Sequence, residues 1–291
     1  MAVKRKFAFN HFEISQVVSR MVNLRSEIVF LGAGKMAGAI AHGLIDAGRV
    51  VPEAMACLGG SGTSAHNLAA ATGMRLARDT ADLLDGADTL VLACKPQQFA
   101  NLDPQIGTFT AGKLVLSVLA GFPLERLAAA FPQSRAVVAI MPNTPAQVGA
   151  GTTVWTAFNS LAESDIVRVE RYFGCLGTVT RIDAALMNAA CATSGSGPGF
   201  FFEMLAAVEQ AAVAAGLPAE IARTLAYGTF IGAAKLLDKS GLPAEVLRDA
   251  VTSPNGTTFA GLRVFDNYNL RNIFAETIAA AAARASELGK M

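Results

Sequence analysis

A glycine-rich segment beginning at residue 32 has the residue types and the spacing of a phosphate-binding turn. It follows the apolar run Ile28–Leu31 and precedes a helical pattern. In G-x-G-x-x-A, the first glycine permits a tight turn, the second lets a pyrophosphate approach the backbone, and the alanine lets helix and strand pack closely. The helix N-terminus adds N–H groups and a partial positive charge. The segment therefore predicts a dinucleotide-binding site made by Gly32, Ala33, Gly34, Lys35, Met36 and Ala37. The alternative interpretation is an ordinary glycine-rich turn that binds no ligand.

The second predicted strand, Ala54–Leu58, ends without the acidic residue that usually binds the ribose hydroxyls of NAD. Its absence favours the 2′-phosphate of NADP, with Ser61, Thr63 and His66 as donors. The loop carries no Arg or Lys, although a cation is the better partner for a phosphate. NADP is therefore the expected cofactor, with NAD left open, and a flexible turn without a ligand is the alternative interpretation.

Three consecutive predicted strands end in small residues or prolines. Ligands of open α/β sheets bind at the carboxyl ends of the parallel strands, and small residues there leave room for a flat nicotinamide ring. Asn143 and backbone groups could bind the carboxamide of that ring, although each strand end alone would also fit an ordinary loop. The expected cofactor contacts at this edge are Ala93, Lys95, Pro96, Gly121 and Asn143, and Ala120 is expected to contact the substrate.

Two later segments combine glycine with hydroxyl-bearing residues ahead of a predicted helix. In the segment 193–199, Ser194 and Ser196 could cap the helix and Pro198 suits its first turn. The segment 252–258 has more hydroxyls than a cap needs, and with its N–H groups it predicts an anion site sized for a carboxylate. The residues expected to bind that carboxylate are Ser253, Asn255, Gly256, Thr257 and Thr258.

Composition and missing residues argue against several other functions. The histidines are His11, His42 and His66, which excludes a His-based triad or a His metal site in the later part of the chain. No pair of carboxylates suggests glycosidase chemistry, and no metal site is expected. A net charge of +1 argues against a nucleic-acid partner, and no apolar run reaches the ~18 residues that span a bilayer. Four cysteines without a CxxC pair, and no secretion signal, indicate reduced thiols in a cytoplasmic protein.

The elements that must position these residues divide the chain at about residue 188. From residue 28 to 187, short apolar runs alternate with helical patterns. This predicts a Rossmann-type, doubly wound α/β domain with a parallel sheet and helices on both faces. From residue 188 to 291 strand signals vanish, and helices are predicted at 199–215, 219–238, 244–251, 257–266 and 273–288. The helix 199–215 is apolar all round, so we expect this helical domain to form a homodimer or higher homo-oligomer with further copies of the chain.

Residues 1–27 precede the first predicted strand and are assigned no function. Ile14, Val17, Val18 and Met21 have helical spacing, so a short amphipathic helix is one interpretation. The other interpretation is that the protein begins at Met21.

The order of these motifs resembles the pyrroline-5-carboxylate reductase family from about residue 28 to 289. The segments that carry the resemblance are FLGAGKMAGAI (30–40), LACKP (92–96), SVLAG (117–121), MPNTP (141–145), SGSGP (194–198) and, most specific, VTSPNGTTFAGL (251–262). The resemblance implies a Rossmann domain that binds NAD(P)H and a helical domain that interlocks with a partner subunit. It also implies that the loop 253–258 of the partner subunit holds the carboxylate of a small cyclic imino acid. The iminium carbon then accepts hydride, while the protein supplies positioning and electrostatics.

By the same resemblance, five positions depart from the family's pattern. Cys191 stands where a Thr is usual whose hydroxyl lies near the imine nitrogen, and a thiol is a weaker donor. Cys191 and Thr258 are the expected catalytic residues, at the imine nitrogen and at the carboxylate. The other departures are Asn188 for Asp, Ala250 for an Asn that helps hold the substrate, Thr80 for an Asn near the adenosine ribose, and Asn255 for Gly. The last change is mild because Asn tolerates a left-handed backbone.

The resemblance implies NAD(P)H-dependent reduction of 1-pyrroline-5-carboxylate to L-proline, and three alternatives stay open. Cys191 and Ala250 would also suit a paralogue that reduces a different cyclic imino acid. A nicotinamide-binding regulatory protein without catalysis could use the same scaffold. A 3-hydroxyacid dehydrogenase would use a catalytic lysine in the second domain, for which Lys235 is the candidate, although the SPNGTT loop argues against it.

Overall fold

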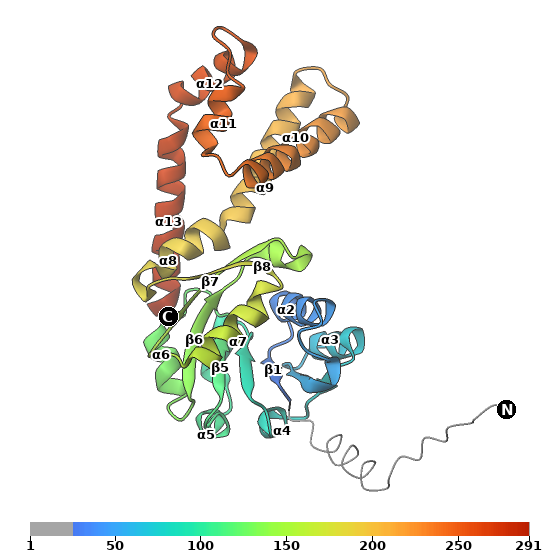
Figure 1. Ribbon diagram of the computed structural model, residues 1–291, viewed down its shortest axis with the longest axis vertical. Coiled ribbons are helices and arrows are strands. Elements are labelled where there is room, and N and C mark those ends of the chain that lie inside the picture. Colours follow the sequence, from blue (N-terminus) through green and yellow to red (C-terminus); the bar gives the residue numbers. More distant parts are fainter. Residues whose placement is uncertain (1–25, 291) are drawn as a thin grey trace, which may run out of the picture. The chain divides into compact units, whose positions relative to one another are not determined.

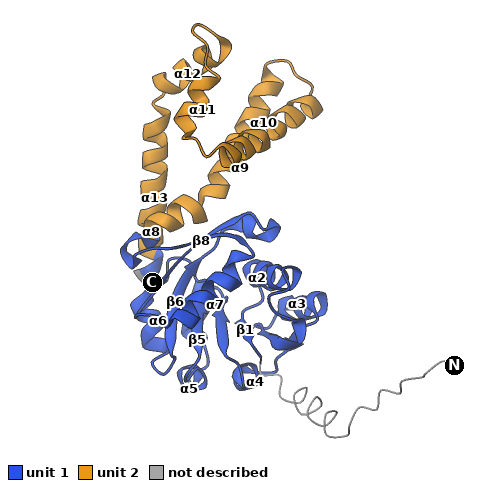
Figure 2. Ribbon diagram, in the orientation of Figure 1, with its two compact units in different colours: residues 1–187, 288–291 blue, residues 188–287 orange. Residues whose placement is uncertain are grey.

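The computed structural model describes residues 26–290, so the interpretations of residues 1–25 lie outside the described part of the chain. The described residues form two compact units (Figure 2), one of residues 26–187 with 288–290 and one of residues 188–287. The first unit is a sheet covered by helices, and the second consists of helices and their connections (Figure 1). The predicted α/β domain followed by an all-helical domain is confirmed.

An eight-stranded sheet forms the middle layer of the first unit. Its order is β3-β2-β1-β4-β5-β6-β7-β8, and neighbouring strands are parallel except for β6 and β7. The strands are β1 (Ile28–Leu31), β2 (Met55–Leu58), β3 (Arg75–Leu76), β4 (Thr89–Leu92), β5 (Leu114–Ser117), β6 (Ala136–Met141), β7 (Gly151–Ala157) and β8 (Gly177–Arg181). The predicted parallel sheet is confirmed for every pair of neighbours but β6 and β7, which are antiparallel because the connection between them is too short for a parallel crossover.

Helices cover both faces of this sheet, as predicted (Figure 1). The core on one face includes residues of α2 (Lys35–Asp46), α3 (Ser64–Thr72) and α7 (Glu163–Gly174), and the core on the other includes residues of α4 (Thr80–Leu84), α5 (Ile106–Phe109) and α6 (Leu124–Ala130). Phe30 of β1 belongs to the first core, whereas Val29 and Leu31 belong to the second. Because strand β1 is buried on both faces, every one of its residues is apolar.

The second unit leaves much apolar surface uncovered. Its helices are α8 (Met187–Ala190), a π-helical turn (Cys191–Gly195), α9 (Gly197–Ala214), α10 (Ala219–Ser240), α11 (Ala244–Ala250), α12 (Thr257–Asn267) and the main part of α13 (Leu270–Lys290). Helices α9 and α10 pack against each other, yet Phe201, Phe202, Leu225 and Ile231 each remain about half exposed. Apolar surface of this extent marks an interaction site.

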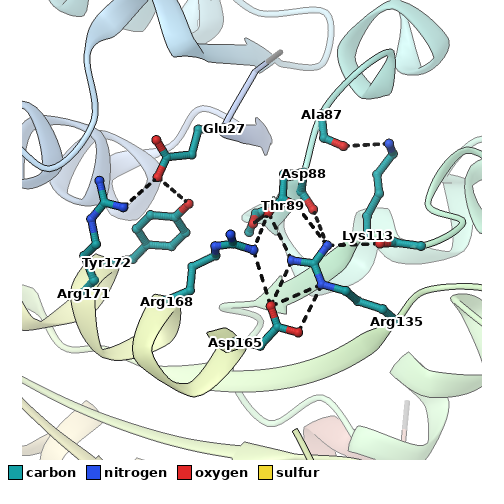
Figure 3. A network of polar contacts seen from close by, with 11 residues as sticks. Glu27, Ala87, Asp88, Thr89, Lys113, Arg135, Asp165, Arg168, Arg171 and Tyr172 are labelled. Carbon is teal, nitrogen blue, oxygen red and sulfur yellow. Dashed lines mark hydrogen bonds and ion pairs between the residues drawn. The ribbon is translucent and has the colours of Figure 1, made fainter. Parts of the chain in front are cut away.

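A network of charged side chains joins the amino ends of β4 and β6 to α7 (Figure 3). Arg135, directly before β6, lies 3.1 Å from Asp88, directly before β4. Its other partner is the buried Asp165 of α7, 3.0 Å away. Arg168, also on α7, contacts the same two carboxylates. Two arginines thus balance two carboxylates at the edge of the sheet opposite the glycine-rich turn.

Glu27, which directly precedes β1, forms polar contacts with two side chains of α7 (Figure 3). The hydroxyl of Tyr172 donates to Glu27 Oε1 at 3.0 Å, and Arg171 Nη1 lies 3.2 Å from the same oxygen. Burial raises the pKa of Tyr172 well above its usual value. Tyr172 is therefore a structural hydrogen-bond donor and not an acid–base group.

Candidate functional site

The turn from β1 into α2 has no room for a side chain at residue 32. Gly32 has a φ of +106°, in the left-handed region, and a Cβ there would overlap the backbone of Ala93 and Cys94 at the end of β4. The Gly32 N–H also donates to the carbonyl of Leu58 at 2.8 Å, which places the end of β2 beside the turn. Glycine alone satisfies both the conformation and the close approach.

The N-terminus of α2 is open where the motif predicts a pyrophosphate. Gly34 is the N-cap, no side chain caps the helix, and a Cβ on Gly34 would have no neighbour within 4 Å. The first intrahelical bond runs from the Gly38 N–H to the Gly34 carbonyl at 3.0 Å, so the N–H groups of Lys35, Met36 and Ala37 precede the helical ladder. Ala37 is fully buried, as the close packing of helix on sheet requires. The room, the N–H groups and the helix dipole suit a phosphate group.

The strands that flank this turn end at one level of the sheet. Leu31 is in register with both Leu58 and Leu92, and Leu92 is in register with Ser117. The strand order runs outward in two directions from β1, which creates the switch point at which dinucleotides bind. The structure therefore brings to one edge of the sheet the turns that contain Gly32, Ala33, Gly34, Ser61, Thr63, Ala93, Lys95, Pro96, Ala120 and Gly121.

Asn143 follows β6 at the same edge, but its side chain is engaged within the fold. It is buried, and its Oδ1 accepts a hydrogen bond from the N–H of Thr152 at 2.8 Å. This bond fastens the end of β6 to β7. The expectation that Asn143 binds the nicotinamide carboxamide stays a prediction, and this oxygen already has a donor.

The loop between β2 and α3 presents hydroxyls beside an uncapped helix. Ser61 and Thr63 are exposed, and Thr63 is the N-cap of α3 without a side-chain bond to the helix. His66 is exposed in the first turn of α3. Thr80 is placed apart from this loop, as the first residue of α4 after β3, where Asp79 caps the helix. The hydroxyls of Ser61 and Thr63 are thus accessible to a ligand of this edge.

Gln98 lies at this edge and was missed by the sequence reasoning. It belongs to the 3₁₀ helix Pro96–Asn101 after β4, and its Oε1 accepts from the N–H of Lys95 at 3.0 Å. Its Nε2 lies 3.8 Å from the position that a Cβ on Gly60 would occupy. Only part of a sequence signal was available: Pro96 and Gln98 suit the first and third positions of a capped helix, but Lys95 lacks the hydroxyl with which a capping box usually begins.

The segment 193–199 of the second unit is not a capped helix start, which corrects the prediction for Ser194 and Ser196. Cys191–Gly195 forms a π-helical turn, and α9 begins two residues later with no side-chain cap. Ser194 Oγ donates to the carbonyl of Ala190 at 3.0 Å. Because the backbone is already helical before α9, its N–H groups find carbonyl partners and need no cap. Short π-helical turns inside helices are frequent at functional sites.

Cys191, the first residue of this π-helical turn, is half-buried. Burial raises the pKa of its thiol above the usual value of 9.0, so the thiol is protonated at neutral pH. A neutral thiol is a weak donor and a poor nucleophile. Burial also raises the pKa of Cys94, at the end of β4, to about 11. Neither thiol is activated for covalent chemistry.

A tight turn precedes α12 in the second unit. Asn255 has a φ of +59°, so this position needs a residue that tolerates the left-handed region, as asparagine does. A Cβ on Gly256 would overlap the hydroxyl of Ser253. The departure from Gly at position 255 is therefore compatible with the turn.

The helix N-terminus that follows is open in the same way as that of α2. No side chain caps α12, and its first bond runs from the Ala260 N–H to the Gly256 carbonyl at 3.0 Å. Thr257 and Thr258 are exposed in the first turn. Their hydroxyls and the N–H groups ahead of the ladder can bind an anion.

Within residues 26–290, no three His, Cys, Asp or Glu side chains are grouped so as to hold a metal ion. No helix in that range has both the length and the apolar character that crossing a bilayer requires. All four cysteines are free thiols.

The fold and the open glycine-rich turn define a dinucleotide-binding protein of the Rossmann type with an attached helical unit. Two family models match the chain: "NADP oxidoreductase coenzyme F420-dependent" over residues 27–121 and "Pyrroline-5-carboxylate reductase dimerisation" over residues 184–288. The chain belongs to the pyrroline-5-carboxylate reductase family, which confirms the resemblance drawn from the motifs.

Similar proteins span almost the whole chain. Pyrroline-5-carboxylate reductase of Methanosarcina acetivorans is 34% identical over 91% of this chain and 98% of its own length. The structure of a pyrroline-5-carboxylate reductase from Coxiella burnetii is 30% identical and superimposes with a TM-score of 0.84, covering 92% of this chain and 100% of its own. That of Plasmodium falciparum pyrroline carboxylate reductase, which has NADP bound, is 26% identical with a TM-score of 0.81 over 90% of this chain and 98% of its own.

Proposed function

We propose that this protein reduces 1-pyrroline-5-carboxylate to L-proline with NADPH. The observation that carries the proposal is that a chain with an open glycine-rich turn at the switch point of its sheet aligns over 91% of its length with pyrroline-5-carboxylate reductase. The alignment with such relatives covers both the Rossmann unit and the helical unit, so it includes both proposed halves of the site. The 3-hydroxyacid dehydrogenase alternative based on Lys235 has no such support.

In this proposal NADPH lies along the carboxyl edge of the sheet. Its pyrophosphate is bound by the N–H groups at the start of α2, beside Gly34, and Ser61 and Thr63 bind the adenosine end. The nicotinamide lies at the ends of the following strands. The residues proposed there are Lys95, Pro96, Ala93, Gly121, Asn143 and, toward the substrate, Ala120. The room at Gly34 and the accessible hydroxyls support this placement.

The carboxylate of the imino acid is proposed to bind at the N-terminus of α12. The N–H groups and hydroxyls of Thr257 and Thr258 would donate to it, and the turn through Ser253, Asn255 and Gly256 would hold them in place. These donors are neutral, so they bind the carboxylate without placing a cation beside the substrate. The positive charge of a protonated imine therefore keeps its electrophilic character.

The reaction requires one hydride and one proton. When bound, the dihydronicotinamide supplies the hydride, which forms a C–H bond at the imine carbon as the C=N π bond breaks. The proton on the nitrogen comes from water, so no histidine is required. We assign to the neutral thiol of Cys191 a weak hydrogen bond at that nitrogen: the thiol donates to the neutral imine and accepts from the N–H of the protonated imine. The protein contributes chiefly by orienting the carboxylate and the cofactor.

The helical unit is proposed to form the homo-oligomer, at least a dimer, that completes the site. The family model that matches this unit is described as a dimerisation model, and its half-exposed apolar side chains suit contact with a second copy. In the proposed dimer, the loop 253–258 of one subunit serves the Rossmann unit of its partner. Four free thiols fit a reducing, cytoplasmic location.

The test is NADPH oxidation by the purified protein with 1-pyrroline-5-carboxylate, with identification of the product. Robust turnover to proline supports the proposal. A second candidate, favoured by the thiol at Cys191, is reduction of another cyclic imino acid, so a six-membered imino acid is assayed in parallel. Better turnover of the six-membered ring would replace the proposed substrate. NADPH binding without turnover of either compound would overturn the enzymatic function.

A further inference from the structure

Gln98 connects two loops of the proposed cofactor edge. Its Oε1 accepts a hydrogen bond from the N–H of Lys95 at 3.0 Å. A backbone N–H can bind only the oxygen of a side-chain amide, so this bond decides which way the amide is oriented. The Nε2 group, which is the donor, therefore points away from Lys95. It lies beside Gly60, 3.8 Å from the position of a Cβ on that residue.

The loop beside this donor has no charged residue of its own. Residues 59–64 read Gly-Gly-Ser-Gly-Thr-Ser, so a 2′-phosphate bound there depends on neutral donors. Gln98 is exposed, which leaves its Nε2 accessible to a ligand that lies on the loop. Hydrogen bonds from neutral donors to a phosphate are charge-assisted and are stronger than bonds between neutral groups. One such donor can shift the preference between two cofactors that differ only by this phosphate.

We propose that Gln98 is a specificity-determining residue, whose Nε2 donates a hydrogen bond to the 2′-phosphate of NADPH. The inference rests on the proposed function, because it takes the dinucleotide to lie on this edge of the sheet. Gln98 thus has two functions in one side chain. The oxygen holds the turn after β4, and the nitrogen selects NADPH over NADH.

The substitution Gln98→Glu separates these two functions. A glutamate at the third position of a capping box accepts the same backbone bond, so the turn after β4 is retained while the donor becomes a negatively charged acceptor. Gln98→Met removes the donor without adding a charge. The matched control is Gln97→Glu, which adds the same charge to the neighbouring exposed residue. Dissociation constants of NADPH and NADH are measured for each protein by titration of cofactor fluorescence, together with the melting temperature.

We expect Gln98→Glu to weaken NADPH binding roughly tenfold or more and to change NADH binding less than about threefold. Gln98→Met should weaken NADPH binding in the same direction by a smaller factor. Gln97→Glu should leave the ratio of the two constants as in the wild type. An unchanged ratio in Gln98→Glu, or an equal shift in Gln97→Glu, overturns the inference while the proposed function stands. A wild-type protein that fails to bind NADPH overturns both.

Discussion

The backbone of Ala93 occupies the space in which a side chain of residue 32 would have to lie. Two turns that are distant in the sequence are therefore coupled, one after β1 and one after β4. The coupling places the glycine-rich turn directly beside the strand end at which the nicotinamide half of the cofactor is proposed to lie. Gly34, two residues further on, has open space instead. The two glycines consequently have different functions, and substitution separates them.

Gly32→Ala should lower the stability of the fold, whereas Gly34→Ala should weaken NADPH binding without lowering that stability. At position 32 the new methyl group meets the backbone of Ala93 in a left-handed conformation, and we expect the free energy of unfolding to fall by about 3 kcal/mol. At position 34 the backbone is extended (φ −80°, ψ −173°), so the unfolding free energy should stay within ~0.5 kcal/mol. The added methyl group would still fill the approach of the pyrophosphate, weakening NADPH binding roughly tenfold.

Urea unfolding and NADPH titration of both variants check this pair. If Gly34→Ala bound NADPH as well as the wild type, the pyrophosphate would have to lie elsewhere.

Thr258→Val should raise the KM for the imino acid about tenfold and leave NADPH affinity unchanged. The change removes a hydroxyl from the open N-terminus of α12, and a hydrogen bond to a charged group contributes about 1.5–3 kcal/mol. The control is Thr224→Val on α10, where the hydroxyl donates to the carbonyl of Glu220 at 2.9 Å within its own helix. Steady-state kinetics on both variants measure the effect. An unaltered KM in Thr258→Val removes Thr258 from the site.

Cys191→Thr should raise kcat several-fold, because a hydroxyl forms a stronger hydrogen bond at the imine nitrogen than a thiol does, as donor or as acceptor. Cys191→Ala, which has no donor, should lower kcat. Burial raises the pKa of this thiol above its usual 9.0, so the thiol is neutral at lower pH and the wild type and Cys191→Ala should have parallel pH–rate profiles below about pH 9. Equal kcat values for all three proteins would place Cys191 away from the reacting atoms.

Arg135→Met should destabilise the first unit by about 3 kcal/mol, because it leaves the buried carboxylate of Asp165 with only the longer contact to Arg168, 3.4 Å away. Arg78→Met is the control. Its side chain is 84% exposed and pairs with Asp82 at 3.4 Å, so its removal should cost less than ~0.5 kcal/mol. Urea unfolding of the three proteins measures the difference. A loss at Arg135 no larger than that at Arg78 would mean that the network does not stabilise the sheet.

The same network predicts how the free energy of unfolding depends on pH in the acidic range. Burial alone would raise the pKa of Asp88, but hydrogen bonds from Arg135 and Thr89, with the charges of Arg135 and Arg168, hold it below the usual 3.8. A carboxylate with a lowered folded-state pKa stabilises the fold above its unfolded pKa and loses that contribution as pH falls through the folded one. Asp88→Asn should therefore be less stable than the wild type at neutral pH. The gap should narrow below about pH 3.8.

The Rossmann part of the first unit could be predicted from the sequence because local patterns define its elements. Glycine-rich turns and continuous apolar runs such as Ile28–Leu31 predict the elements that surround the switch point. Strands β3, β7 and β8 were not predicted. Strand β3 has only two residues, and most residues of β8 are exposed. Helix α7 contains many charged residues. Asp165 and Arg168 of this helix pair with Arg135 and Asp88, which are distant in the sequence, so no local pattern predicts these ion pairs.

In the second unit, the positions of the helices were predicted well, but the local structure of the candidate site residues was predicted less well. Ser194 and Ser196 have the residue types of caps, but the preceding backbone is helical through a π-turn, and a π-turn has no simple sequence pattern. Gln98 was missed for another reason. Its capping box begins at a lysine, so the sequence pattern lacks the usual hydroxyl. The Nε2 group of Gln98 comes to lie beside Gly60 only because β2 and β4 both pair with β1 in the folded sheet.

In the proposed reaction, hydride passes from the nicotinamide to the imine carbon of 1-pyrroline-5-carboxylate. The most direct measurement uses NADPH deuterated at the transferred position of C4 and analyses the product by mass spectrometry. We expect proline that carries one deuterium on the former imine carbon, formed in step with NADPH oxidation. Proline without deuterium, or no proline while NADPH binding is confirmed in the same sample, would contradict the proposed reaction.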